Sequence, residues 1–455
     1  MTEHVICLAD YIITMDKNRR IVEDGAVVVE DDRIAAVGPR DEVLPRYPDC
    51  EILGGDHRLV MPGLINGHIH LPQFMMRGVN DAVGCLTLLT KYIWPIQGCY
   101  DEEDALTSSR LGLLEMLKSG TTCFLSTGLH PRYGMDGICS EVEQSGLRGV
   151  ISKYVFQGGR FSGYEAAIHP GLWEDGEVAL RQAEELIQNW NGRGEGRIQI
   201  WISPRSVGAG TPEYYRRASA LARRYGVGLT THWVQIKENA EFIRKTYDTT
   251  PAGLADLIGL LSEKSVLVHG IYFEDGDFDL LAAAGTTVCH CPVCNTKLGM
   301  GIARVKEMRE AGVNVCLGND GMPDNNTADL FREMRTYCLM QRQLYGDLTH
   351  PSSMEALELA TINGARGLGL QDEIGSIEPG KKADLIILDL GQPHLIPVID
   401  PANTVVWSAN GSDVETVLVD GRVLMRKRKV FTLDEPQILE EAQARSEKVL
   451  HQAGL

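Results

Sequence analysis

Two kinds of apolar pattern alternate through the middle of the chain. Short continuous runs rich in Val, Ile, Leu and Thr are followed by longer stretches in which apolar residues recur at helical spacing. Continuous apolar runs are typical of parallel strands buried on both faces. The predicted strands are 63–68, 121–127, 148–156, 198–203, 228–233, 265–270, 286–291 and 314–320, and the predicted helices include 101–119, 174–190, 211–225, 302–311 and 326–345. Eight strands alternating with helices predict an α/β fold, a (β/α)8 barrel of the TIM type over residues 61–370.

The two ends of the chain show a different pattern, in which strand-like runs follow one another without helices between them. These runs are 5–16 and 25–38 near the start, and 383–390, 404–409 and 415–430 near the end. We therefore expect one β-sandwich domain built from both termini. Its N-terminal part would be residues 1–60, and its C-terminal part, together with a terminal helix, residues 371–455.

Composition narrows the range of partners and compartments. The 455 residues carry a net charge of −18, which disfavours binding to nucleic acid. The chain has no apolar run of 18 residues, and its N-terminus lacks the features of a signal peptide. The 11 cysteines are irregularly spaced, as is typical of reduced thiols. We expect a cytoplasmic protein with a small-molecule substrate, no nucleic-acid or membrane partner, and a homo-oligomeric assembly.

A pair of histidines follows the first predicted barrel strand, in the segment "GLINGHIHLPQ". His68 and His70 are two residues apart, so in an extended chain both side chains point to the same face. Two neutral imidazoles on one face are either ordinary hydrogen-bonded residues at a strand end or ligands of a divalent ion. The pair alone does not decide between these alternatives.

Further polar residues stand at the ends of the later barrel strands, where TIM barrels carry their chemistry. Because the strand ends of a barrel share one rim, these side chains and the histidine pair are expected to converge, and a metal site explains them better than separate structural roles do. The later strand-end residues are His232, His269, His290 and Asp320.

A reaction follows from this ligand chemistry. Three or four imidazoles and one carboxylate hold a divalent ion that lowers the pKa of water and supplies hydroxide. Asp320 is expected both to contact the metal and to act as general base, and His290 to hydrogen-bond the attacked oxygen or the leaving group. The predicted reaction is hydrolysis at an sp² carbon bonded to nitrogen or a halogen.

Four segments together carry a resemblance to a known family: "MPGLINGHIHLPQFMMRG", "GTTCFL", "HCPVCNTKLGMGIARVKEMREAGVNVCLGNDG" and "IGSIEPGKKADLIILDL". The chain resembles the amidohydrolase superfamily, in the branch of adenosine-derivative deaminases, guanine deaminase and triazine hydrolases. The resemblance implies that His68, His70, His232 and Asp320 bind metal and that His269 lies beside it. Strand four lacks a bridging lysine, so one divalent ion is expected, zinc first, with iron or cobalt as alternatives.

The chain departs from that branch at two positions. Gln235 stands where deaminases usually carry a glutamate that shuttles protons, and Arg205 stands where many relatives carry histidine. An amide does not exchange protons at neutral pH, whereas a guanidinium is a permanent donor. We therefore expect hydrolysis of an amide, urea or carbamate, as in relatives that act on phenylureas and thiocarbamates.

Two alternatives stay open. The first is a deaminase or chlorohydrolase acting on a purine, pterin or triazine-like ring, with another acid such as Glu238 transferring protons. The second is a barrel that binds metal without catalysis. Expected substrate contacts are Gln73, Arg205, Trp233 and Gln235, whereas His130 and Arg160 are expected to be surface groups. A structural zinc at Cys289, Cys291 and Cys294 is disfavoured, because a fourth ligand is not evident.

Overall fold

The computed structural model describes residues 4–48, 50–157 and 168–455, and its centre is a parallel eight-stranded barrel. Every neighbouring pair of these strands is parallel. The last strand meets the first through a bridge between Ile69 and Asp320, which closes the ring. The barrel strands are β6 (Leu64–Ile69), β7 (Thr121–Leu129), β8 (Arg148–Val155), β9 (Ile198–Pro204), β10 (Leu229–Trp233), β11 (Ser265–His269), β12 (Thr287–His290) and β13 (Asn314–Leu317). The predicted TIM-type barrel is thus confirmed.

Helices surround the barrel, and their first turns explain where several of them start. Asp101 caps α4 by accepting a hydrogen bond from Asp104 N, and Thr211 caps α7 in the same way. The five predicted helices correspond to α4 (Glu102–Lys118), α6 (Gly176–Trp190), α7 (Pro212–Tyr225), α12 (Val305–Glu310) and α14 (Leu330–Tyr345). The outer layer also includes α5 (Met135–Ser145), α8 (Lys237–Tyr247), α9 (Pro251–Leu257), α10 (Asp277–Ala283), α15 (Ser353–Ala360) and α16 (Ile362–Gly367). None of the helices in the described ranges is long and apolar enough to cross a membrane.

Short helical segments lie at the mouth of the barrel. They include the 3₁₀ segment Leu71–Met76 directly after β6, α2 (Cys85–Leu88), α3 (Trp94–Cys99), α11 (Pro292–Lys297) and α13 (Met322–Asn325). Because each follows or approaches the carboxyl end of a strand, these segments bring loop side chains over the barrel opening.

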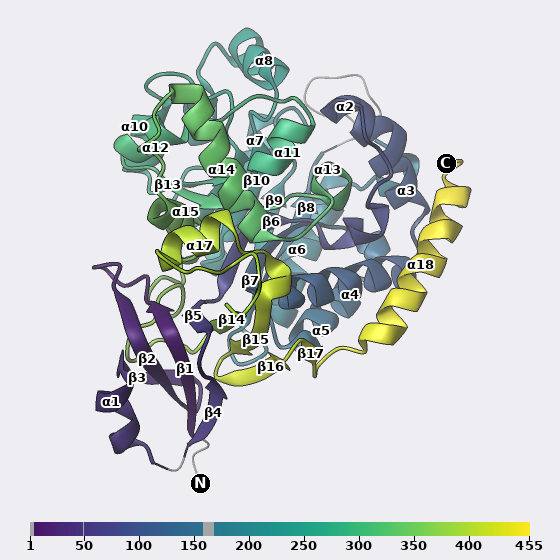
Figure 1. Ribbon diagram of the computed structural model, residues 1–455. Helices are drawn as coiled ribbons and strands as arrows, with labels where there is room; N and C mark the ends of the chain where they lie inside the picture. The colour runs from purple at the N-terminus through teal and green to yellow at the C-terminus, as the bar shows by residue number, and fades with distance from the viewer. Residues whose placement is uncertain (1–3, 49, 158–167) are drawn as a thin grey trace.

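Both termini build a second domain, which lies beside the lower end of the barrel in Figure 1. β5 pairs with β14 in antiparallel register, which joins the N-terminal part to the C-terminal part. Hydrogen bonds link all nine strands into one mixed sheet. Its strands are β1 (His4–Ile13), β2 (Ile21–Glu30), β3 (Arg33–Pro39), β4 (Glu51–Gly54), β5 (Arg58–Pro62), β14 (Leu385–Asp389), β15 (Val414–Val419), β16 (Arg422–Arg426) and β17 (Lys429–Val430).

One predicted strand is wrong. Residues 404–409 were expected to be extended, but 401–407 form the helix α17 (Pro401–Trp407). Asp400 caps this helix by accepting a hydrogen bond from Asn403 N, and Pro401 occupies the first turn, where its missing N–H costs nothing. The local start signal therefore outweighs the preference of the Thr-Val-Val run for a strand.

The two domains meet at a buried cluster of charges. Arg148, at the start of β8, donates to Asp384 Oδ1 and Oδ2, each at 3.1 Å, and to Asp420 Oδ1 at 2.6 Å. Asp384 precedes β14 and Asp420 follows β15, so one guanidinium connects the barrel to the terminal sheet. β5 ends at Pro62 and β6 begins at Leu64. The limits 1–60, 61–370 and 371–455 stay a prediction.

The last helix, α18 (Glu435–Gln452), packs against α3, α4 and the 3₁₀ segment Leu71–Met76 on the barrel side of the molecule (Figure 1, yellow). Ser446 Oγ donates to Met75 O at 2.8 Å, and Lys448 Nζ lies 3.0 Å from both carboxyl oxygens of Asp104. α18 therefore supports the 3₁₀ segment that follows the histidine pair.

The charge cluster at the domain junction gives a test of stability. Arg148→Ala leaves two buried carboxylates without their shared donor, so we expect the free energy of unfolding to fall by about 3–5 kcal/mol. The matched control is Arg217→Ala, which removes the exposed ion pair with Glu177 and should leave the unfolding midpoint nearly unchanged. Denaturant unfolding followed by circular dichroism measures both variants. Equal midpoints for Arg148→Ala and wild type would contradict the linking role.

Candidate metal centre and cavity

Four side chains from three parts of the barrel rim meet above its centre. His68 Nε2 and His70 Nε2 each lie 3.2 Å from Asp320 Oδ1, and His70 Nε2 lies 3.3 Å from His232 Nε2. The four ligand atoms of His68, His70, His232 and Asp320 all lie within 4.8 Å of one another. The structure thus brings together the set that the sequence predicted, in a geometry able to hold a metal ion.

A hydrogen bond on the side of the His70 ring that faces away from the cluster determines which ring nitrogen directs its lone pair towards the cluster. His70 Nδ1 lies 2.9 Å from Thr127 O, and because a carbonyl only accepts, Nδ1 carries the hydrogen. His70 Nε2 is then an acceptor that faces Asp320 Oδ1, another acceptor. Two lone pairs that face each other in a buried site fit a cation between them, and a carbonyl behind the ring is a common support for a ligating histidine.

Two of the strand-end residues hold an unusual backbone conformation. His269 has φ 74° and Asp320 has φ 66°, both in the left-handed region that non-glycine residues seldom adopt. Asp320 N donates to His68 O at 3.0 Å, so the turned backbone of Asp320 is fixed by the first barrel strand. Strain of this kind is often found at functional sites, where neighbouring contacts hold it.

A second group of possible ligands shares Asp320. Cys294 Sγ donates to Asp320 Oδ2 at 3.0 Å, and His269 Nε2 lies 3.6 Å from the same oxygen. The three ligand atoms also lie within 4.8 Å of one another. His269 Nδ1 is 3.0 Å from Asn295 Oδ1, which leaves Nε2 facing the carboxylate. The sequence had suggested Cys294 only as part of a structural zinc site.

Burial sets the charge of these groups. It lowers the pKa of His68 to about 4, and it lowers the pKa values of His232 and His269 as well, so these three imidazoles are neutral at pH 7, the form that binds metal. Burial by itself raises the pKa of Asp320, but the facing imidazoles, first of all the hydrogen bond from His68, outweigh it and hold this pKa well below its ordinary value. The centre therefore presents one negative charge.

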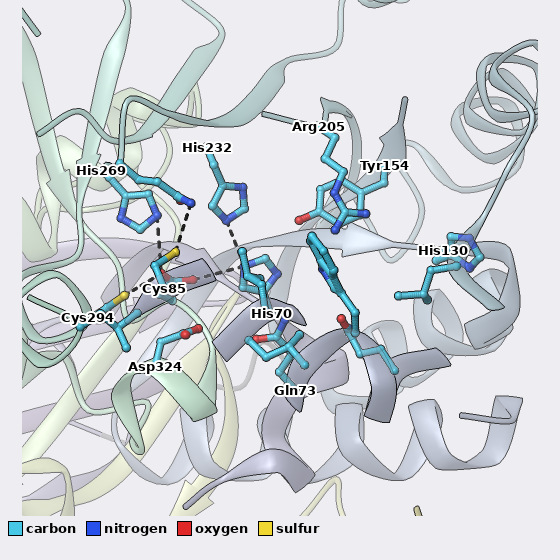
Figure 2. A pocket seen from close by; sticks show the side chains of 18 of the residues that line it. His70, Gln73, Cys85, His130, Tyr154, Arg205, His232, His269, Cys294 and Asp324 are labelled. Carbon is cyan, nitrogen blue, oxygen red and sulfur yellow. Dashed lines mark hydrogen bonds and ion pairs between the residues drawn. The ribbon is translucent and has the colours of Figure 1, made fainter. Parts of the chain in front are cut away.

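A cavity opens beside the cluster, with different chemistry at its two ends (Figure 2). His232, His269 and Cys294 lie at one end, and Arg205, Tyr154 and His130 lie towards the other. The Arg205 guanidinium carbon lies 5.4 Å from the centre of the Trp94 ring and 5.1 Å from that of Tyr154. The far end is thus a cation held among aromatic rings, a surface suited to a flat polar molecule.

Both predicted glutamine contacts lie on the cavity wall. Gln73 is 5% exposed, and its Oε1 has no hydrogen-bond partner among the described residues. Gln235 Nε2 lies 3.5 Å from Cys85 Sγ, and both residues line the same cavity as His232 and Asp320. Gln73 therefore offers a free acceptor, and Gln235 an amide, to whatever the cavity binds.

The cavity contains a second carboxyl group that was not predicted from the sequence. Asp324 lies in α13, is 8% exposed and lines the wall near Gln73 (Figure 2). Burial, and then the charge of Asp320, raise the pKa of Asp324 well above its ordinary value. The one available signal was its position four residues after the strand-end aspartate, one turn into a short helix.

Apart from the metal ligand His68, two predicted site residues do not reach the cavity wall. Trp233 is fully buried on the opposite face of β10 from His232, where its Nε1–H donates to Pro251 O at 3.1 Å. Strand alternation explains this, because neighbouring residues point to opposite faces. His290 lies behind the wall, with its Nδ1 3.5 Å from Asn295 Nδ2. Direct contact between His290 and the reacting atoms is therefore not supported. His290 contacts Asn295, which in turn contacts His269.

Several lesser expectations are also resolved. Glu238 is exposed and absent from the cavity wall, so it is poorly placed to transfer protons. His130 was expected at the surface but is 7% exposed and lines the cavity. Arg160 lies outside the described residues. Within the described ranges, no possible metal-binding group contains Cys289 or Cys291.

Comparisons with known proteins cover nearly the whole chain. The family model described as the amidohydrolase family matches residues 59–424, and one for an imidazolonepropionase-like composite domain of bacteria matches residues 25–49. A 5-methylthioadenosine/S-adenosylhomocysteine deaminase of Moorella thermoacetica is 35% identical over 94% of this chain and 96% of its own length. A 5'-deoxyadenosine deaminase of Methanosarcina mazei is 34% identical over 97% of each chain.

Solved structures agree with the fold. An adenosine deaminase from Xanthomonas campestris, crystallised with bound zinc, superposes with a TM-score of 0.90 at 26% identity and covers 98% of both chains. An atrazine chlorohydrolase from Arthrobacter aurescens, also complexed with zinc, has a TM-score of 0.86 at 23% identity and covers 97% of this chain and 100% of its own. The second likeness concerns the fold alone.

The neutral histidines predict a pH dependence of stability. The pKa of His68 is about 4 in the folded chain against an ordinary 6.5, so the unfolded state takes up the proton first as pH falls. In chelator-treated protein, stability should decrease from pH 6.5 and level off near pH 4, with His68 contributing about 3 kcal/mol. His68→Asn should show a smaller decrease by denaturant unfolding, and the exposed control His57→Asn should behave as wild type. An identical pH profile for His68→Asn and wild type would rule this out.

Proposed function

The chain belongs to the amidohydrolase family, and from this membership we propose that it hydrolyses a carbon–nitrogen bond, other than a peptide bond, in a small neutral molecule. We propose one divalent ion as its cofactor, with zinc as the first choice and iron or cobalt as alternatives. The substrate we favour is an amide, urea or carbamate with a flat group that fits among the aromatic rings near Arg205.

The donor set supports this cofactor. Three imidazole nitrogens and Asp320 Oδ1 lie close together, without enough hydrogens to satisfy one another, and their residues are buried except for His232, which is half-buried. Nitrogen and oxygen ligands in this number suit zinc in a catalytic site. When bound, such an ion lowers the pKa of a water molecule and polarises a substrate carbonyl.

The remaining chemistry belongs to side chains of this chain. Asp320 Oδ2 is directed away from the histidine pair, so in this proposal it accepts the proton of the attacking water and returns it to the leaving nitrogen. Gln73 Oε1, a buried acceptor with no partner in the described part of the chain, receives a substrate N–H. Arg205 donates to a carbonyl or ring nitrogen at the far end of the cavity.

The observation that carries the choice of substrate is the amide of Gln235. It lines the same cavity as His232 and Asp320, where it can orient a carbonyl but cannot transfer a proton. Attack of hydroxide on a carbon of a heteroaromatic ring usually requires protonation of a ring nitrogen, whereas an amide, urea or carbamate has a carbonyl that a metal ion can polarise. The cavity wall therefore favours an amide, urea or carbamate as the substrate.

Deamination of an adenosine derivative is the second candidate. The relatives named above are deaminases of such compounds and match over nearly their full length. The buried Asp324 carboxyl also lines the cavity, and because its pKa is raised it can hold a proton at the cavity wall. In this candidate Asp324 supplies the proton that Gln235 cannot.

A substrate panel separates the two candidates. Enzyme loaded with zinc, iron or cobalt is assayed against phenylureas, anilides and carbamates for release of the amine, and against adenosine, 5'-deoxyadenosine and S-adenosylhomocysteine for release of ammonia. Amine release with the first group supports the proposal. Ammonia release from the nucleosides alone replaces it with the second candidate, and metal-dependent turnover of neither group counts against both.

The ligand assignment gives a direct test. His232→Ala removes a proposed ligand, and since even indirect changes around a metal site cost on the order of 10–100-fold, bound metal should fall to a small fraction of that in wild type. Trp233→Phe is the matched control, because the neighbouring Trp233 side chain points away from the cluster. This variant should bind as much metal as wild type. Metal content by mass spectrometry after exhaustive dialysis reports both. Equal metal in the two variants would refute the assignment.

A single substitution tests the role of Gln235. Gln235→Glu places a charge on the cavity wall and should lower turnover of an amide or urea substrate by about tenfold or more. It should also introduce slow release of ammonia from adenosine, since a carboxyl there can transfer protons. Gln97→Glu adds the same charge elsewhere on the cavity wall and should produce no ammonia. A large rise in amide or urea turnover in Gln235→Glu would be incompatible with the proposed role.

A further inference from the structure

The two oxygens of Asp320 face two different groups of side chains. Oδ1 lies 3.2 Å from the Nε2 atoms of both His68 and His70. Oδ2 lies 3.0 Å from Cys294 Sγ and 3.6 Å from His269 Nε2. A carboxylate with one oxygen in each of two ligand groups is the arrangement that bridges two metal ions in many two-metal sites.

The group around Oδ2 has the properties of a site in its own right. His269 Nδ1 is engaged with Asn295 Oδ1 at 3.0 Å, so Nε2 presents a lone pair towards Oδ2. In a tetrahedral zinc site, ligand atoms lie about 3.3–3.8 Å apart, and the separation of His269 Nε2 from Oδ2 falls within that range. His269 and Cys294 also line the cavity, which leaves a path for an ion to enter and a position for water.

We propose that Cys294, His269 and Asp320 form a second, thiolate-containing metal site that shares the Asp320 carboxylate with the first. A thiolate, an imidazole and a carboxylate favour thiophilic ions, so Zn²⁺ and Cd²⁺ bind there and Mg²⁺ does not. On binding, Cys294 forms the S–metal bond and its proton leaves to solvent. The site is weaker than the first, because it has three protein ligands and the thiol must be deprotonated in a buried place.

Occupation of this site has a consequence for turnover. Asp320 Oδ2 is the atom that accepts the proton of the attacking water in the proposed function, and a second ion occupies that atom. Excess Zn²⁺ or Cd²⁺ therefore inhibits the enzyme, while one equivalent supports it. This inhibition rests on the proposed function, whereas the binding of the second ion does not.

The experiment titrates the holoenzyme with Cd²⁺ and follows both stoichiometry and the ultraviolet sulfur-to-cadmium charge-transfer absorption. Wild type should bind a further equivalent and show the band. Cys294→Ser should lose both. Cys85→Ser is the matched control, because Cys85 also lines the cavity but contacts Gln235 and not Asp320, and it should retain both.

The outcomes distinguish this site from the first one. A wild type that binds no further Cd²⁺ and shows no band overturns the proposal, as does a band that survives in Cys294→Ser or disappears equally in Cys85→Ser. His232→Ala disrupts only the first group and should keep the band, so failure of the first site leaves the second testable. Relief of Zn²⁺ inhibition in Cys294→Ser, each variant compared with its own activity at one equivalent, tests the consequence for turnover.

Discussion

The hydrogen bond from Asp320 N to His68 O is the interaction on which the rest of the site depends. It belongs to the only bridge recorded between the last and first barrel strands in the described ranges, so closing the barrel and placing the carboxylate are one event. The left-handed backbone of Asp320 then turns its side chain across the rim, where its oxygens reach both groups of ligands. A change that loosened this closure would disturb the metal centre even if every ligand were still present.

Much of the architecture could be predicted from sequence because its signals are local and repeated. Apolar strands that alternate with helices indicated a barrel, and polar residues at the strand ends indicated chemistry on one rim. The resemblance to the amidohydrolase superfamily then implied that His68, His70, His232 and Asp320 are the metal ligands among those strand-end residues. The strand assigned to 404–409 failed for an equally local reason, since the cap at Asp400 decides the conformation of the residues after it.

The remaining features depend on which way a side chain points and on what lies next to it in space. Trp233 and His232 are neighbours in sequence, yet only His232 reaches the cluster. Cys294 and Asp324 come from the short helices α11 and α13, whose approach to the cavity is set by tertiary packing, so hydrophobic periodicity does not mark them. The same holds for His130, whose burial follows from the segments packed around it and not from its own sequence context.

The packing of α18 on the segment after β6 joins residues that are far apart in the order of synthesis. Ser446 and Met75, whose carbonyl accepts its hydrogen bond, are separated by 371 positions. In the same way, β5 can complete its pairing only after β14 has been synthesised. A chain emerging from the ribosome can therefore form many barrel units early, but the wall that carries Gln73 gains its support only when the final helix has been made. Assembly of the site is thus among the last steps of folding, and a nascent chain holds no finished binding cavity until synthesis is nearly complete.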